Sequence, residues 1–142
     1  MGNDRIAWLG TPESRIISIR KFRKYIDTLP FEQAVELIKS NWESGPKINK
    51  PKFDISNIKY WPTPWDLFSQ TTFCINSQAL GTFYTLLLSE HGKHHEIKLA
   101  IIEDIIQGEK VTIVLDNYSL SDYNVSTIVR REDIIDKLGI DA

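Results

Sequence analysis

The chain has 142 residues, of which 42% are hydrophobic and 25% are charged, and its formal net charge is −2. A chain of this length buries roughly two-thirds of its unfolded surface on folding, so we expect a single domain over residues 1–142. The near balance of charge excludes a strong field toward nucleic acid or an anionic membrane, and we expect neither as a partner. No apolar run approaches the roughly 20 residues of a membrane helix, and the first residues lack the apolar region of a signal peptide, which favours a cytosolic protein.

The first part of the chain has the pattern of two helices. Thr11-Pro12-Glu13-Ser14 supplies an N-cap hydroxyl, a proline at the first helical position and an acid in the first turn. Apolar residues at three- and four-residue spacing continue this helix to Leu29, and five basic residues within residues 15–24 supply its polar side. Pro30 separates it from a second apolar stripe over residues 31–42.

The remaining sequence predicts two more helices followed by strands. Residues 46–62 contain three prolines and indicate an irregular crossing, Thr63-Pro64-Trp65-Asp66 indicates the start of a short helix, and residues 72–90 keep helical period. Apolar and β-branched runs predict strands at residues 97–102, 111–115 and 125–129, and a short helix at residues 132–138. Helices first and strands second predict an α+β fold, with the N-terminal helices packed on a small C-terminal antiparallel sheet.

Cysteine and histidine usage limits the possible chemistry. Cys74 is the only cysteine, so the chain forms no internal disulfide and no cysteine-rich zinc site. The three histidines, His91, His94 and His95, lie close together but lack the spacing of a metal-binding helix motif. We therefore expect no metal and no cofactor.

Cys74, His95 and Asp116 are the residue types of a thiol enzyme, in that order along the chain. Cys74 falls at the start of a predicted helix, where the helix dipole favours the thiolate, while His95 begins one predicted strand and Asp116 ends the next. This order resembles the core of transglutaminase-like thiol enzymes over residues 72–117. The resemblance implies a transglutaminase-like or papain-like form of the fold, and acyl transfer or amide hydrolysis as the activity.

Two features of the sequence depart from that family. Glu96 follows the histidine where the family has aromatic and small residues, and the segment between Cys74 and His95 is short. Asn117 beside Asp116 leaves the residue that orients the histidine open. The alternative reading of Cys74 is a buried core residue between Phe73 and Ile75, because free cysteine is among the most often buried residue types.

Aromatic and basic segments are candidate binding surfaces. Trp61 and Trp65 flank two prolines, and a rigid aromatic cluster of this kind anchors a partner or closes a core. The basic residues within residues 15–24 form a solvated helix face, or else a surface whose binding to an anionic partner weakens with salt.

Three segments with Cys74 carry a resemblance to a small family of accessory proteins of T-even-type tailed bacteriophages. They are residues 6–13, the Trp61-Pro62-Thr63-Pro64-Trp65-Asp66-Leu67 run and residues 79–85. The resemblance implies a protein that acts in the host cytoplasm on host machinery or host defence. We therefore expect a phage accessory protein that binds a host protein, with a thiol enzyme and a component of the virion as alternatives.

Overall fold

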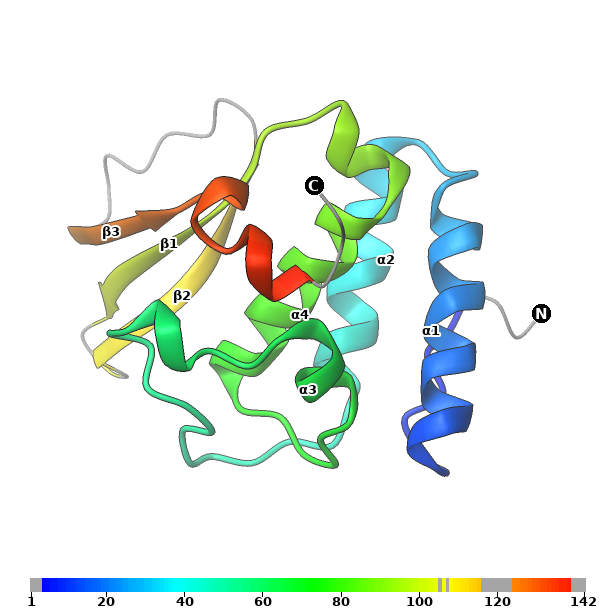
Figure 1. The fold of residues 1–142 in the computed structure, drawn as a ribbon, viewed down its shortest axis with the longest axis horizontal. Coiled ribbons are helices and arrows are strands. Elements are labelled where there is room, and N and C mark those ends of the chain that lie inside the picture. The colour runs from blue at the N-terminus through cyan, green and yellow to red at the C-terminus, as the bar shows by residue number, and fades with distance from the viewer. Residues whose placement is uncertain (1–3, 105, 107, 116–123, 139–142) are drawn as a thin grey trace.

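The computed structural model describes residues 4–104, 106, 108–115 and 124–138. Helices α1 (Pro12–Ile26), α2 (Phe31–Glu43), α3 (Pro64–Phe68) and α4 (Ile75–Leu88) precede strands β1 (Ile97–Asp104), β2 (Gly108–Leu115) and β3 (Asn124–Val129). Figure 1 shows the strands on one side of α4, with α2 and then α1 on the other. Four short 3₁₀ helices complete the described elements: η1 (Ile58–Tyr60), η2 (Glu90–Lys93), η3 (Arg131–Asp133) and η4 (Ile135–Leu138). The α+β architecture expected from the sequence is confirmed.

Both helix starts that the sequence predicts from a threonine followed by a proline are present. The Thr11 side chain accepts a hydrogen bond from the Ser14 backbone N–H at 3.1 Å, with Pro12 as the first residue of α1. At α3, Thr63 and Asp66 cap each other through both side chains, at 3.1 and 3.3 Å. These local bonds satisfy backbone N–H groups that the helices themselves leave unpaired.

The strands form one antiparallel sheet in the order β2-β1-β3. Ile97 lies opposite Leu115 at one end of the β1–β2 ladder, and Asp104 lies opposite Gly108 at the other. Gly108 has φ +76°, a left-handed conformation that suits the start of β2 after the turn. The third strand joins the free side of β1, with an irregularity in the register between Ile101 and Ile102.

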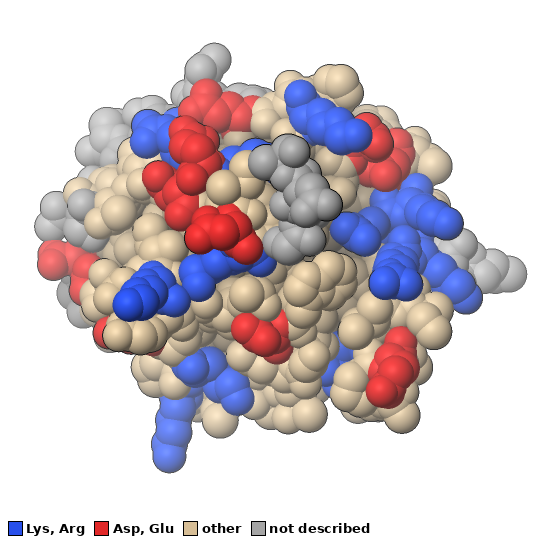
Figure 2. Space-filling view, in the orientation of Figure 1, with Lys and Arg blue, Asp and Glu red and all other residues tan. Residues whose placement is uncertain are grey.

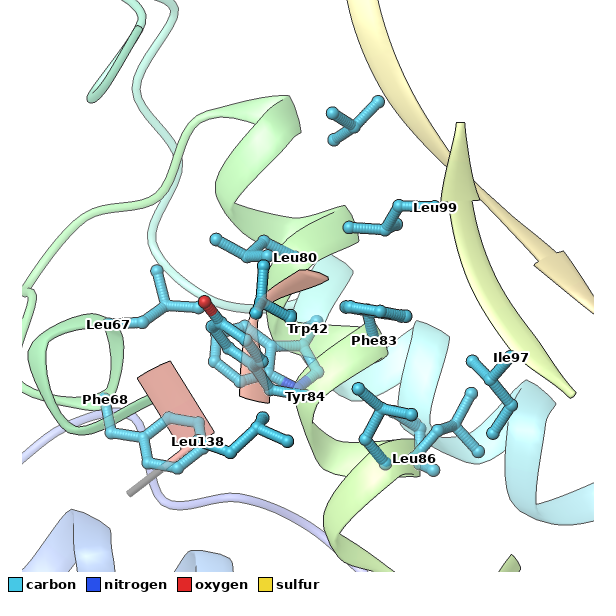
Figure 3. Packing of buried hydrophobic residues seen from close by; sticks show 14 of the residues in the cluster. Trp42, Leu67, Phe68, Leu80, Phe83, Tyr84, Leu86, Ile97, Leu99 and Leu138 are labelled. Atoms are coloured by element: carbon cyan, nitrogen blue, oxygen red, sulfur yellow. The ribbon is translucent and has the colours of Figure 1, made fainter. Parts of the chain in front are cut away.

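Helix α4 is the centre of the main core. Its Gly81 lies against the ring of Trp42 on α2, and Trp42 donates a hydrogen bond to Thr85 at 3.0 Å. The Tyr84 hydroxyl donates to the Pro62 carbonyl oxygen at 2.7 Å, and burial raises the pKa of Tyr84. Figure 3 shows side chains from helices α2, α3 and α4, from β1 and from η4 meeting in this core. They include Trp42, Leu67, Phe68, Leu80, Phe83, Tyr84, Leu86, Ile97, Leu99 and Leu138.

Arg15 departs from the polar role that the sequence predicted for it. Its side chain is 4% exposed, and its guanidinium donates to the carbonyl oxygens of Trp8, Phe68 and Gln70. The residue thus ties α1 to the segment before it and to the end of α3. In the described residues, no helix has the length and apolar character needed to cross a membrane.

Candidate functional site

Cys74 occupies the N-cap of α4, at the head of the central helix as the sequence predicted. Its sulfur is 3.1 Å from the Ser77 hydroxyl oxygen and accepts from the Ser77 backbone N–H at 3.4 Å. The residue is only 3% exposed, although it contributes to the lining of an open cleft that also contains Lys47 and Asn76. In this position the thiol acts as a helix cap, the role that a serine hydroxyl more often has.

The histidines lie beyond the opposite end of α4. The His95 ring stacks on Phe31 with ring centroids 3.6 Å apart and an interplanar angle of 5°. His91 Nε2 is 2.9 Å from the Ile26 carbonyl oxygen, at the end of α1. Both rings are therefore held against the segments that begin α2 and end α1.

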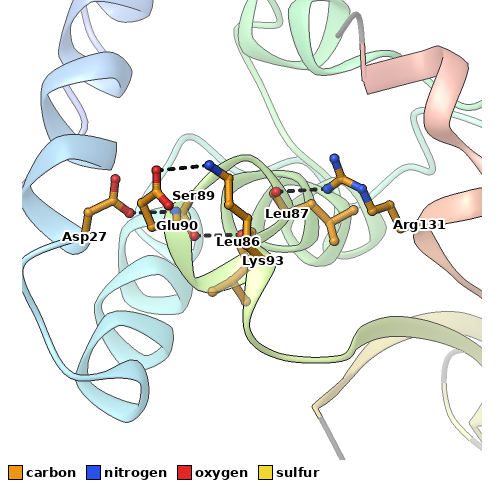
Figure 4. Close-up of polar contacts among 7 residues, drawn as sticks. All are labelled: Asp27, Leu86, Leu87, Ser89, Glu90, Lys93 and Arg131. Atoms are coloured by element: carbon orange, nitrogen blue, oxygen red, sulfur yellow. Dashed lines mark hydrogen bonds and ion pairs between the residues drawn. The ribbon is translucent and has the colours of Figure 1, made fainter. Parts of the chain in front are cut away.

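Further polar contacts fix this end of α4. The Glu90 backbone N–H donates to the Asp27 carboxylate at 2.9 Å, and Lys93 pairs with the Glu90 side chain at 3.2 Å. Arg131 donates to the Leu87 carbonyl oxygen at 3.1 Å. Figure 4 shows these contacts joining α1, the end of α4 and the segment that follows β3. The histidine-bearing segment is thus fixed to the C-terminal end of the helix.

The structure does not bring Cys74 and His95 together. The 14 residues of α4 lie between them, which corresponds to about 20 Å along the helix axis. Contacts with the sheet show the same separation. Asn76, near Cys74, accepts a hydrogen bond from the Val111 backbone N–H at 3.0 Å, and Val111 pairs with Ile101 on β1. His95 precedes Ile101 by six residues, roughly 20 Å of extended chain.

This separation corrects the proposed Cys74-His95-Asp116 set. In the described residues the sulfur has hydrogen-bond partners only from Ser77, so no imidazole stands ready to take the thiol proton. Asp116 lies outside the described residues. The described chain also contains no group of three histidine, cysteine or acidic side chains arranged to hold a metal ion.

The two tryptophans of the aromatic segment have opposite environments. Trp61 is 2% exposed, donates from Nε1 to the Ile55 carbonyl oxygen at 3.3 Å and packs edge-on to Phe53. Its expected role on a binding surface is therefore corrected to a core role. Trp65 is 40% exposed and meets Phe68 edge-on, and Tyr60, five residues earlier in the chain, is 65% exposed. Within this segment the exposed aromatic side chains are thus those of Tyr60 and Trp65.

The basic surface of α1 contains four of the five cations expected there. Arg20, Lys21 and Lys24 are exposed, and Arg23 is partly buried. None of the four forms an ion pair within the described part of the chain. Figure 2 shows Lys and Arg side chains gathered over α1, while the surface over α3 in the same view is mostly uncharged.

Arg23 has an unusual environment within this basic surface. Its Nε atom is buried and has no hydrogen-bond acceptor in the part of the chain that the structure describes. Burial lowers the pKa of its guanidinium, and the neighbouring charge of Arg20 lowers it further, while Asp27 acts in the opposite direction. Sequence reasoning did not single out Arg23, because its spacing resembles that of the other exposed cations.

Comparison of the chain with protein-family models, with curated proteins and with solved structures finds no match. The candidate binding residues are therefore described from the structure alone: the exposed side chains of Tyr60 and Trp65, and the α1 cations.

Proposed function

We propose that the chain is a bacteriophage accessory protein that acts in the host cytoplasm by binding a host protein. The observation that carries the proposal is the exposure of Trp65 on a capped helix, with Tyr60, five residues earlier in the chain, also exposed. Tryptophan, tyrosine and arginine contribute most to binding energy at protein interfaces. The resemblance of residues 6–13, 61–67 and 79–85 to T-even-type phage accessory proteins supports a host protein as the partner.

Trp65 is held in place before any partner binds. Thr63 and Asp66 cap each other, and Pro64, Leu67 and Phe68 on the same short helix are buried. Burial of these three residues leaves Trp65 on the outer side of α3. Because the backbone at Trp65 is already fixed, only the rotamers of its side chain lose freedom on binding, which favours affinity.

Affinity capture from a lysate of the bacterial host tests the proposal. The protein is immobilised as wild type, as Trp65→Ala, as Tyr60→Ala and as Ile106→Ala, and bound proteins are quantified by mass spectrometry. Ile106 is the matched control, because it is 91% exposed and follows β1 in the turn before β2. We expect one host protein to bind wild type and Ile106→Ala, and its recovery to fall at least about tenfold with Trp65→Ala.

The folding of each variant is checked by thermal unfolding before capture. Tyr60→Ala removes a side chain that is exposed, so its fold should remain intact, and it provides a second reading if Trp65→Ala loses stability. Equal recovery of the same proteins by wild type and by both aromatic variants would contradict the proposal.

A further inference from the structure

The basic half of α1 contains charge repulsion that no ion pair of these cations relieves within the described chain, although Asp27 at the C-cap partly opposes the effect of Arg20 on Arg23. Arg20 lies three and four residues before Arg23 and Lys24, and Lys21 lies three residues before Lys24. Like charges at these spacings are neighbours on a helix surface and destabilise it. Two ion pairs of the described chain, between Lys93 and Glu90 and between Lys98 and Glu96, lie outside this helix.

Arg23 adds an unsatisfied hydrogen-bond donor to this repulsion. Its Nε–H is buried and meets no acceptor among the described residues, while the residue as a whole is partly exposed. Buried donors are nearly always paired, because an unpaired one loses its hydration and gains nothing in return. Because the buried Nε–H is out of reach from outside, a carboxylate of a partner bonds to the two terminal nitrogens of the guanidinium, in parallel, and also reduces the repulsion with Arg20.

We propose that the basic half of α1, residues 20–24, docks a short acidic segment of a protein partner, with one carboxylate on Arg23. The inference rests on the proposed function and specifies the chemistry of the partner. Exposed apolar side chains lie on the same helix, with Ile17 52% exposed and Tyr25 36% exposed. An apolar side chain of the acidic segment packs on one of them.

The charge pattern favours a protein segment over nucleic acid. Residues 20–24 extend about 6 Å along the helix axis, a length that accommodates one or two carboxylates. A nucleic acid carries its phosphate charges in a long series, and a protein binds them with cations arranged along the same path. Here Glu13 and Asp27 lie beyond the two ends of the basic stretch, and both are exposed. Their negative charges repel a phosphate chain that would run along the helix beyond residues 20–24.

Fluorescence anisotropy with a defined probe tests the inference. The probe is a labelled peptide of about 15 residues built from Glu-Glu-Leu repeats, which supplies both carboxylates and apolar side chains. The comparison probes are the corresponding Lys-Lys-Leu peptide and a single-stranded oligouridine of similar length. We expect the acidic peptide alone to bind, and its affinity to fall steeply as salt is raised from about 0.05 to 0.3 M.

Variants locate the site of binding. Arg23→Gln should weaken the acidic peptide about tenfold, because a charge-assisted paired bond is lost. Lys39→Gln removes one exposed positive charge from α2 and should change the affinity less than about twofold, as expected of a remote surface charge. In NMR spectra, the Arg23 Nε–H signal should move on addition of the acidic peptide.

Three results would overturn the inference: no binding of the acidic peptide, equal loss with Arg23→Gln and Lys39→Gln, or tighter binding of oligouridine than of the peptide. These results are distinguishable from a failure of the proposed function. If a host protein is captured through Trp65 and its recovery is unchanged by Arg23→Gln, the acidic-segment inference fails while the proposed function stands.

Discussion

Replacement of Arg15 by methionine isolates the contribution of its three hydrogen bonds. Methionine keeps an unbranched side chain in the buried site but supplies no donor. The change removes bonds of 2.9 Å to the Phe68 carbonyl oxygen, 2.6 Å to that of Gln70 and 3.0 Å to that of Trp8. The bonds to Phe68 and Trp8 are buried, and the bond to Gln70 is partly buried, so water replaces only the last without cost.

The expected loss of stability follows from these environments. Leaving a buried carbonyl oxygen unsatisfied costs about 1–3 kcal/mol, so two of them cost about 2–6 kcal/mol. Methionine recovers part of this, because burying the guanidinium charge is itself unfavourable. We expect a net decrease of about 2–4 kcal/mol in the free energy of unfolding.

Urea denaturation followed by tryptophan fluorescence measures this decrease. Arg20→Met is the matched control, because Arg20 is exposed on the same helix, and it should change the free energy of unfolding by less than about 0.5 kcal/mol. Arg15→Lys should lose part of the stability, since one ammonium group cannot reproduce the fork that bonds three carbonyl oxygens. A decrease below about 1 kcal/mol for Arg15→Met would refute the reasoning.

Three further outcomes follow from the structure. Gly81→Ala should lower the free energy of unfolding by about 1–3 kcal/mol in thermal denaturation, because the new methyl group would stand 2.5 Å from the Trp42 ring. Rescue by Trp42→Phe would confirm this cause, and an unchanged melting temperature of Gly81→Ala would contradict it. Native Cys74 should react with iodoacetamide at least about tenfold more slowly than the denatured thiol, since it is buried and bonded to Ser77; equal rates would show an open thiol. The pKa of Tyr84 is raised in the folded state, so above about pH 10 the unfolded chain releases this proton while the folded protein keeps it, and the free energy of unfolding should fall. Tyr84→Phe should show a smaller fall in urea denaturation measured across this pH range, and an identical pH profile would refute the linkage.

The sequence predicts the helix starts and the sheet because their causes are local. The Thr11-Pro12 and Thr63-Pro64 pairs act within one helical turn, and the apolar and β-branched runs of residues 97–102 and 111–115 favour strands by residue type. Alternate residues of β1 are buried in two clusters, with Leu99 and Ile101 in the main core and Ala100 and Ile102 in a smaller one. Arg15 shows where residue type is a poor guide. It is in line with Ile19, Phe22 and Ile26 at helical spacing, and all four are buried on that side of α1. The periodicity therefore carried the signal that the charge of the side chain obscured.

Trp61 and Trp65 show a limit set by tertiary structure. Both belong to one proline-flanked run, and composition gives them the same expected role. Their difference arises because Trp61 packs against Phe53 and bonds to Ile55, whereas Trp65 follows Pro64 on the outer side of a short helix. The direction in which α3 leaves the preceding turn decides which ring is covered, and that direction depends on residues distant in sequence, such as Tyr84 through its bond to Pro62.

The cysteine and histidine show why the order of residue types does not define a site. A helix between Cys74 and His95 separates them by its length unless the chain turns back along it. The chain does turn back, but as β1, and it begins that return at His95. The residues that reach the level of Asn76 are therefore Ile101 and its partner Val111, which lie in the core. An imidazole near the Cys74 thiol would have to lie about six residues later in the chain, at a position that this sequence gives to isoleucine.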